Sequence, residues 1–297
     1  MFKIGGYEDM KIKLFNSVFV YLILLLFFSI SLVTIRTFQL ILFTDFETGF
    51  YCGPEYLNYL FLGIILLFAI IILLLICKDS TKYQLKLFLS KCYILKIFSI
   101  ITAFFLVIYL FTYIFSIFKY NQTNKIMACF VFVFGILATI CYIYLPIRIK
   151  KDKGGFTDIT FLFPCLFASV QLINMFLEYM VMFSIMENMI NILRITSLSI
   201  FLLCLGKLIA RVEGKLTQKI MVFTGFISIL LSLCNIIPDL IIYIISFINK
   251  TSYIKQYENN NIADSAPFDF IVSIFALIFL IQYFMSRKKE KEKEIES

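Results

Sequence analysis

Eight long apolar segments, separated by short charged or polar stretches, dominate this sequence of 297 residues. Hydrophobic residues make up 61% of the chain and charged residues only 15%, whereas soluble globular domains have about 45–50% and about 25%. A helix that crosses the hydrocarbon core of a bilayer needs about 20 mostly apolar residues, and most of the segments reach that length. The sequence therefore predicts an all-α, polytopic integral membrane protein whose helices pack in one bundle.

We expect a single transmembrane bundle over residues 1–286 and a charged cytoplasmic tail over residues 287–297. The first span is expected to be retained, because its apolar run exceeds the roughly 7–15 residues of a signal peptide. The sixth span is the weakest, because it is short and begins beside Arg194. The eight predicted spans are residues 14–35, 57–77, 93–118, 126–147, 160–185, 195–210, 220–248 and 268–285.

The distribution of Lys and Arg tests this number of crossings, because the cytoplasmic loops of membrane proteins keep positive charge. With eight crossings and both termini inside, 21 of the 27 Lys and Arg residues fall on the cytoplasmic side. Without the sixth span there would be seven crossings, and the basic tail that begins at Arg287 would lie outside. The net charge of +8 therefore reflects topology, and no nucleic-acid partner is expected.

This topology makes a direct prediction. Reporter fusions near Lys151 and at the C-terminus should report the same, cytoplasmic, side of the membrane, because both positions belong to the cation-rich set. Fusions that place the two positions on opposite sides would overturn the eight-helix arrangement.

The absence of histidine restricts the chemistry available to the chain. Histidine is the usual proton shuttle and the commonest metal ligand, so catalytic triads and histidine-based zinc sites are excluded. The eight cysteines occur singly, without a CxxC pair, which is typical of small buried hydrophobic residues. The sequence also contains no nucleotide-binding loop or dinucleotide-binding glycine motif. We therefore expect no cofactor, no metal site and no enzymatic activity.

The segment between the first two spans has a distinctive order of residues. Ile35-Arg36-Thr37-Phe38-Gln39-Leu40 is followed by Asp45-Phe46-Glu47-Thr48-Gly49-Phe50 and then by Gly53-Pro54. Acidic turn formers and a glycine between apolar runs predict a short hairpin or an interfacial turn over residues 38–52. The segment resembles one in uncharacterised polytopic membrane proteins of low-GC Gram-positive anaerobic bacteria. That resemblance implies a multi-pass protein of a bacterial cytoplasmic membrane and carries no activity with it.

The polar residues of the seventh span share one face. At about 100° per residue, Ser232, Asn235 and Asp239 point to the same side of the helix. Pro238 is expected to bend the helix beside Asp239 and free a backbone carbonyl. The opposite side is apolar and suits lipid. The same polar face also carries Thr224, Gly225, Ser228, Tyr243 and Ser246.

The fifth span carries a similar face, which holds Gln171, Asn174 and Glu178 beside several methionines. Glu178 and Asp239 lie almost equally far past the predicted starts of two parallel helices, so they are expected at similar depths in the outer half of the membrane. Ionisable side chains inside a bilayer are costly and mark candidate functional sites. Their natural partners are arginines at the predicted outer ends of the first and sixth spans. The candidate binding residues are therefore Glu178, Asp239, Asn174, Gln171, Asn235, Ser232, Arg36 and Arg194, with Met175, Met182, Met186 and Met189 on the same face.

Three functions fit such a polar seam. The first is a transporter or permease-like protein with an outer-facing polar cavity that is lined by the fifth and seventh helices. The alternative is a non-catalytic membrane subunit or sensor that binds other membrane proteins, or a second copy, through the same face, since Ser, Thr, Asn and Gln also hold helices together. The third is an intramembrane enzyme, for which the two carboxylates are the only candidate acid-base pair.

Overall fold

The computed structural model describes residues 5–43, 52–78, 93–120, 125–150, 160–179, 185–210, 214–249 and 266–296. Within these residues seven helices are long and apolar enough to cross a membrane, and an eighth carries the shorter apolar stretch Phe270–Phe284. The prediction of an all-α, polytopic membrane protein is thus confirmed. The helices are α1 (Gly5–Phe43), α2 (Glu55–Lys78), α3 (Tyr93–Tyr120), α4 (Lys125–Lys150), α5 (Phe163–Tyr179), α6 (Ile185–Ile209), α7 (Lys215–Asn249) and α9 (Ala266–Glu296).

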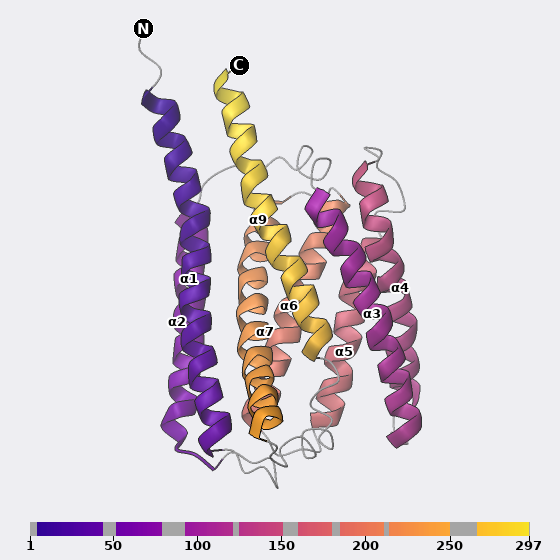
Figure 1. Ribbon diagram of the computed structural model, residues 1–297. Helices are drawn as coiled ribbons and strands as arrows, with labels where there is room; N and C mark the ends of the chain where they lie inside the picture. Colours follow the sequence, from indigo (N-terminus) through magenta and orange to yellow (C-terminus); the bar gives the residue numbers. More distant parts are fainter. Residues whose placement is uncertain are drawn as a thin grey trace.

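The start of α1 and the end of α9 project from the same side of the bundle (Figure 1). An even number of crossings requires this placement. The charged residues that follow Arg287 continue α9 as a helix through Glu296. The side from which the two ends project is called the inner side below, following the predicted topology, and the opposite side is called the outer side.

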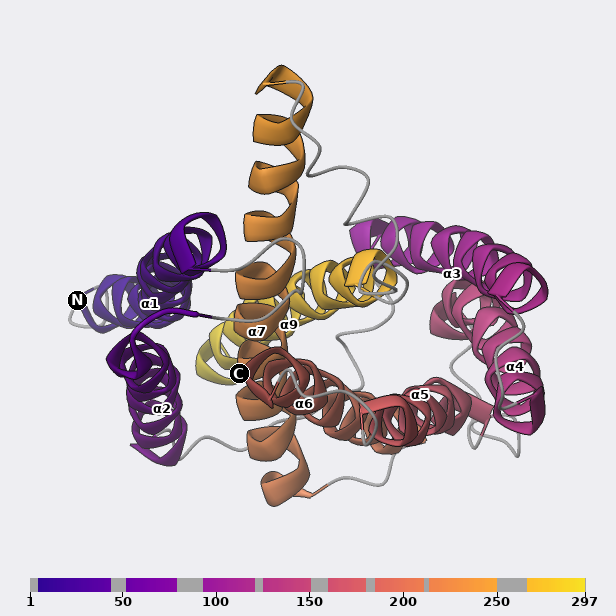
Figure 2. The same ribbon diagram turned by 90° about the horizontal axis from the view of Figure 1, so that it is seen from below.

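Six helices close a ring. Neighbours pack in the order α3, α4, α5, α6, α7 and α9, and α9 returns to α3. Seen from the outer side, α7 passes through the centre of the molecule, with α3, α4 and α5 on one side and α1 and α2 on the other (Figure 2). The hairpin of α1 and α2 therefore lies outside the ring, where it packs mainly against α7.

Burial differs sharply among the helices. About two thirds of the most apolar window of α6 and of α7 is buried, 67% in each, compared with 22% for α2. The buried residues of α2 recur every three or four positions, so a single stripe faces the protein and lipid covers the rest. The buried stripe of α2 consists of Phe61, Ile65, Phe68, Ile72 and Ile76. The interior of the protein is therefore built around α6 and α7.

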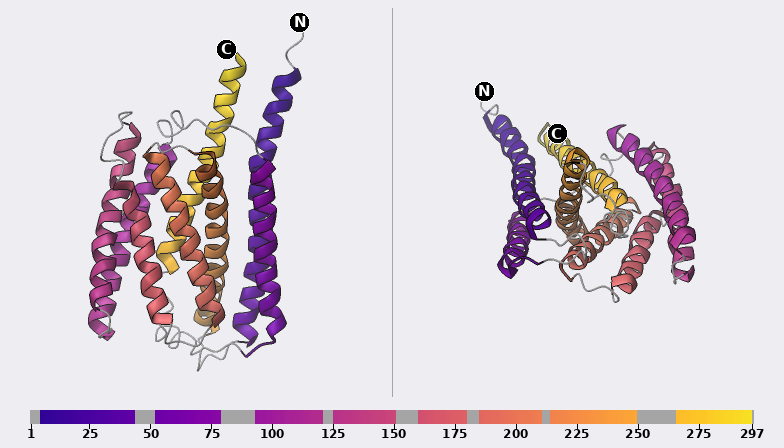
Figure 3. Two further views of the ribbon diagram at one scale, coloured as in Figure 1. Left: turned by 180° about the vertical axis from the view of Figure 1, so that it is seen from behind. Right: turned by 60° about the horizontal axis from the view of Figure 1, so that its bottom comes forward.

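The helix α9 begins at a distance from the outer side of the ring (Figure 1). The start of its ribbon lies farther from the outer side than the outer ends of α1, α2 and α7 (Figures 1 and 3). Pro267 is the second residue of α9, which suits the first turn of a helix, where a backbone N–H has no intrahelical partner. The outermost part of the ring is therefore formed by α3, α4, α5, α6 and α7.

Three predicted boundaries were wrong. The fifth helix ends at Tyr179 and the sixth begins at Ile185 rather than at 195, so Met186 and Met189 belong to α6. The start at 195 assumed that Arg194 marks the membrane surface, whereas the bundle buries this residue within α6. Similarly, α1 continues to Phe43, so residues 38–43 are helical rather than part of a hairpin or turn. Residues 44–51 lie outside the described part of the chain.

Gly206 allows α6 to approach the start of α5 closely. A Cβ atom at this position would lie 2.9 Å from Leu162 Cδ2 and 3.0 Å from the backbone oxygen of Phe161. Backbone atoms cannot move aside as a side chain can. Small residues at such crossings are typical of membrane helices, whose association depends on close van der Waals packing.

We expect Gly206→Val to lower the melting temperature of the detergent-purified protein, because overpacking a tight contact costs about 1–3 kcal/mol. Gly63→Val is the matched control, since no heavy atom of the described residues lies within 4 Å of the same position there. Circular dichroism at 222 nm measures both transitions. Equal melting temperatures would contradict the close approach of α5 and α6.

Candidate functional site: a polar layer inside the ring

Two contacts fix the register of α6 against α7. The side-chain nitrogen of Asn235 donates a hydrogen bond of 2.9 Å to Asn191 Oδ1. Toward the inner side, the ring of Phe201 lies against Gly225. Because the two helices are antiparallel, this register places Arg194 level with Ser232. The hydroxyl of Ser232 is 2.6 Å from that of Ser273, which extends the same level to α9.

The contact at Gly206 fixes the register of α5 in the same way. It places Asn174 level with Arg194, and Gln171 about one turn closer to the inner side. Gln171 follows Phe167 by four residues and Pro164 by seven, so the three share one face of α5. Phe167 packs on Tyr109 and Phe268 inside the ring, with centroid distances of 6.4 and 5.7 Å. Gln171 and Asn174 therefore face the interior.

Polar side chains from four helices thus lie within about one turn of the level of Arg194. This set is named the polar layer. Most of its members are buried, and two hydrogen bonds between helices, from Asn235 to Asn191 and between Ser232 and Ser273, lie within it. The polar layer consists of Gln171, Asn174, Asn191, Arg194, Ser232, Asn235 and Ser273.

Arg194 is the charged member of the polar layer. Only 1% of the residue is exposed, and among the fully buried side chains of the described residues it is the largest by volume. It precedes Phe201 by seven residues and so shares the face of α6 on which Phe201 packs against Phe279 of α9, at 6.0 Å. Burying a guanidinium is costly unless other groups neutralise and hydrogen-bond it. Its position therefore requires a polar interior at this depth.

Gln171 is the second notable member. Its exposed fraction is 5%, and its Nε2 is buried without a hydrogen-bond partner within the described part of the chain. Leaving such a donor unsatisfied typically costs about 1–3 kcal/mol. The interior face of α5 therefore offers a free N–H donor about one turn from the level of Arg194.

The polar stripe predicted on α7 divides into two parts. The hydroxyls of Thr224 and Ser228 donate to backbone oxygens of their own helix, at 2.8 and 2.9 Å. Ser232 and Asn235 instead bond to neighbouring helices. Tyr243, farther out, is 58% exposed. Only the middle of the stripe therefore contributes to the polar layer.

The structure describes the side chain of only one of the two predicted acids. Asp239 lies one turn beyond Asn235 on the same face of α7, half-buried at the outer edge of the polar layer. Glu178 belongs to α5, but its side chain lies outside the described residues. The helices α5 and α7 make at most marginal contact within the described ranges, because α6 packs between them. The cavity lined by the fifth and seventh helices stays a prediction, to which the structure adds α6 as a helix that lies between the two.

Arg36 belongs to a separate cluster. Its Nη1 donates to Gln39 Oε1 at 3.4 Å, and Gln39 Nε2 donates to Asn58 of α2 at 3.1 Å. The helix α1 packs on the face of α7 that carries Phe226, through a stacked Tyr21 at 5.4 Å. At about 100° per residue, that face is opposite Asn235. The pairing of Arg36 with the acids stays a prediction, and the bond described for Arg36 joins it to Gln39.

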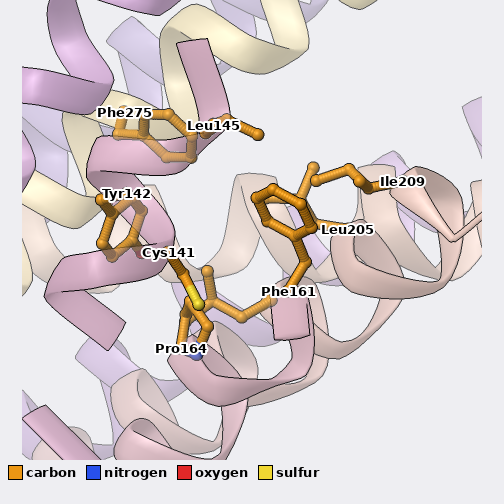
Figure 4. Close-up of a pocket in the computed structure, with 9 residues that line it drawn as sticks. Cys141, Tyr142, Leu145, Phe161, Pro164, Leu205, Ile209 and Phe275 are labelled. Atoms are coloured by element: carbon orange, nitrogen blue, oxygen red, sulfur yellow. The ribbon is translucent and has the colours of Figure 1, made fainter. Parts of the chain in front are cut away.

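Apolar packing fills the ring on the inner side of the polar layer. Tyr142 of α4 meets Phe275 of α9 edge to face at 5.5 Å, and Ser99 of α3 donates a hydrogen bond to the backbone oxygen of Tyr142. A pocket of about 10 Å3 remains between α4, α5, α6 and α9 (Figure 4), which is at the lower limit of the space that one water molecule needs. It is lined by Cys141, Tyr142, Leu145, Phe161, Pro164, Leu202, Leu205, Ile209 and Phe275.

Asn191 and Ser273 were missed as site residues. Asn191 and Arg194 are three residues apart, a spacing that puts both on one helix face. This signal was lost because the sixth span was started after Arg194. Ser273 is the one serine of the apolar stretch Phe270–Phe284, and no periodic pattern distinguishes it. Comparison of the chain with protein-family models, curated proteins and solved structures finds no match.

We expect the Asn191–Asn235 hydrogen bond to couple α6 and α7 energetically. In unfolding by a denaturing detergent, Asn191→Leu and Asn235→Leu should each destabilise the protein. The double variant should lose less than their sum, by about 0.6 kcal/mol, the average for interhelical hydrogen bonds in membranes. Thr224→Val is the control, because the Thr224 hydroxyl bonds to its own helix, and its effect should add to that of Asn191→Leu. Full additivity in both pairs would refute the coupling.

Proposed function

We propose that the protein is a membrane transporter in which the polar layer binds a small solute on its way through the six-helix ring. The observation that carries this proposal is the burial of Arg194, 1% exposed, in the interior of the ring. Uncharged Ser, Asn and Gln suffice to hold membrane helices together by hydrogen bonds. Packing of the helices alone therefore does not require a charged guanidinium. Ionisable residues that face a bundle interior are typical of solute and proton pathways.

The packing on either side of the polar layer supports an approach from the outer side. Toward the inner side, apolar and aromatic side chains such as Tyr142 and Phe275 fill the ring. Toward the outer side, Asp239 is half-buried and the start of α9 is set back from the outer ends of its neighbours. The packed pair of Tyr142 and Phe275 is named the aromatic plug. A solute bound at this depth reaches the inner side only when the helices around the aromatic plug move apart. Alternating access of this kind is common in small transporters.

The proposal is tested by flux in liposomes that contain the purified full-length protein and an entrapped pH-sensitive dye, under an imposed Na⁺ or K⁺ gradient. Asp239→Asn and Glu178→Gln should each lower proton- or cation-coupled flux at least tenfold, because a neutral amide cannot carry a proton or balance a cation. Thr224→Val is the control, since its hydroxyl is satisfied within its own helix and lies outside the polar layer. Flux that neither acid variant changes would exclude this coupling role.

A second candidate is a membrane subunit or sensor. It is favoured by the position of α1 and α2, which lie outside the ring and pack mainly on α7. Most of α2 is lipid-facing, and such a peripheral hairpin presents a broad helical surface to another membrane protein. Purification in mild detergent distinguishes the two functions. A stable, stoichiometric partner favours the subunit, whereas a homogeneous protein with flux in liposomes favours the transporter.

A further inference from the structure

Pro146 in α4 and Pro238 in α7 each lie inside a helix. A proline has no backbone N–H, so the carbonyl four residues earlier loses its usual helical partner. At Pro146 that carbonyl belongs to Tyr142, and it accepts a hydrogen bond from the Ser99 hydroxyl of α3. At Pro238 it belongs to Cys234, and no side chain of the described residues donates to it. The two prolines therefore differ in how the freed oxygen is satisfied.

The Cys234 carbonyl lies in a protected place. Cys234 is 1% exposed, and α7 runs from the inner to the outer side, so its carbonyls point outward along the helix. Asp239 lies little more than one turn farther out, and its side chain leans back toward the inner side, as helical side chains do. The carbonyl oxygen and the carboxylate therefore approach each other across the turn that contains Pro238.

Asn235 supplies a third oxygen to this turn. Its Nδ2 donates to Asn191 Oδ1 at 2.9 Å, which leaves the Oδ1 of Asn235 as an acceptor. Asn235 and Asp239 are four residues apart and share one face of α7. A carboxylate has about four lone-pair sites, so Asp239 can keep a protein partner while it also binds an ion. In membrane transporters, backbone carbonyls freed at a helix break coordinate Na⁺.

We propose that the turn around Pro238 binds an alkali-metal cation through the Cys234 carbonyl, Asn235 Oδ1 and the Asp239 carboxylate. This inference deepens the proposed transport function, on which it rests for its physiological meaning, because it names the class of ion that is coupled to the solute. The single carboxylate balances one positive charge. Arg194 adds a positive charge to the same layer, and the described residues contain no group of three or more His, Cys, Asp or Glu side chains that could hold a metal ion. A monovalent ion therefore fits the site better than a divalent one.

Cation binding is tested with the purified full-length protein in detergent. Its melting temperature is measured while choline chloride is replaced stepwise by sodium chloride or potassium chloride at constant ionic strength. We expect a saturable rise with at least one of the two alkali ions, because an ion that binds only the folded state stabilises it. Pro238→Ala restores the N–H that satisfies the Cys234 carbonyl. It should raise the apparent dissociation constant about tenfold or more, as the loss of one contact with a charged group predicts.

Pro146→Ala is the matched control. It restores the same kind of N–H in α4, where the Tyr142 carbonyl already has the Ser99 hydroxyl as a partner, so cation binding should stay unchanged. Asp239→Asn removes the charge of the site with little change of shape and should abolish the saturable rise. This variant decides the question on its own should Pro238→Ala fail to fold. The site is refuted if neither alkali ion gives a saturable rise over choline, or if Pro238→Ala and Pro146→Ala bind the ion alike.

The liposome experiment separates this inference from the proposed function. Alkali-ion binding that depends on Pro238, without flux in liposomes, would leave the site standing and remove transport. Flux that depends on Asp239, without any saturable effect of sodium or potassium on the melting temperature, would leave transport standing and remove the cation site.

Discussion

Hydrocarbon offers no hydrogen-bond partner to a backbone or to a polar side chain, and this constraint determines both the helices of the protein and the place of their polar residues. The backbone satisfies itself within each helix. The polar side chains have two solutions, and α7 shows both: Thr224 and Ser228 bond to their own helix, whereas Ser232 and Asn235 bond across the ring. Only the second solution ties neighbouring helices together at a fixed depth.

Arg194 is the member of the polar layer that its own helix cannot satisfy. A buried guanidinium needs several oxygen acceptors, and backbone carbonyls in a helix are already engaged. The polar groups nearest to it in the register of the helices are Asn191, one turn away on α6, and the polar faces of α5 and α7. The large apolar residues around this depth, such as Ile195 and Phe201, exclude lipid and keep the polar groups together.

The division of the molecule into a ring and an external hairpin separates two kinds of role. The ring contains the charged interior, the aromatic plug around Tyr142 and Phe275, and the close crossing at Gly206. The hairpin of α1 and α2 contains its own polar cluster, in which Arg36, Gln39 and Asn58 are joined by hydrogen bonds. Because α7 borders both, a change in its tilt or bend at Pro238 would act on the ring and on the hairpin together.

The sequence by itself determined the fold class, because the length and composition of the apolar segments leave a chain such as this no soluble alternative. It also determined which residues share a face on α5 and α7, because the periodicity of a helix is a local property. Only the tertiary structure decided that α6 lies between these helices, that Arg194 is an interior residue rather than a boundary, and that Arg36 lies across α7 from the polar layer. The physical reason is that the order of helices around a bundle depends on the shapes of their contact surfaces. Gly206 and Gly225 set two of those contacts, and hydropathy does not record shape.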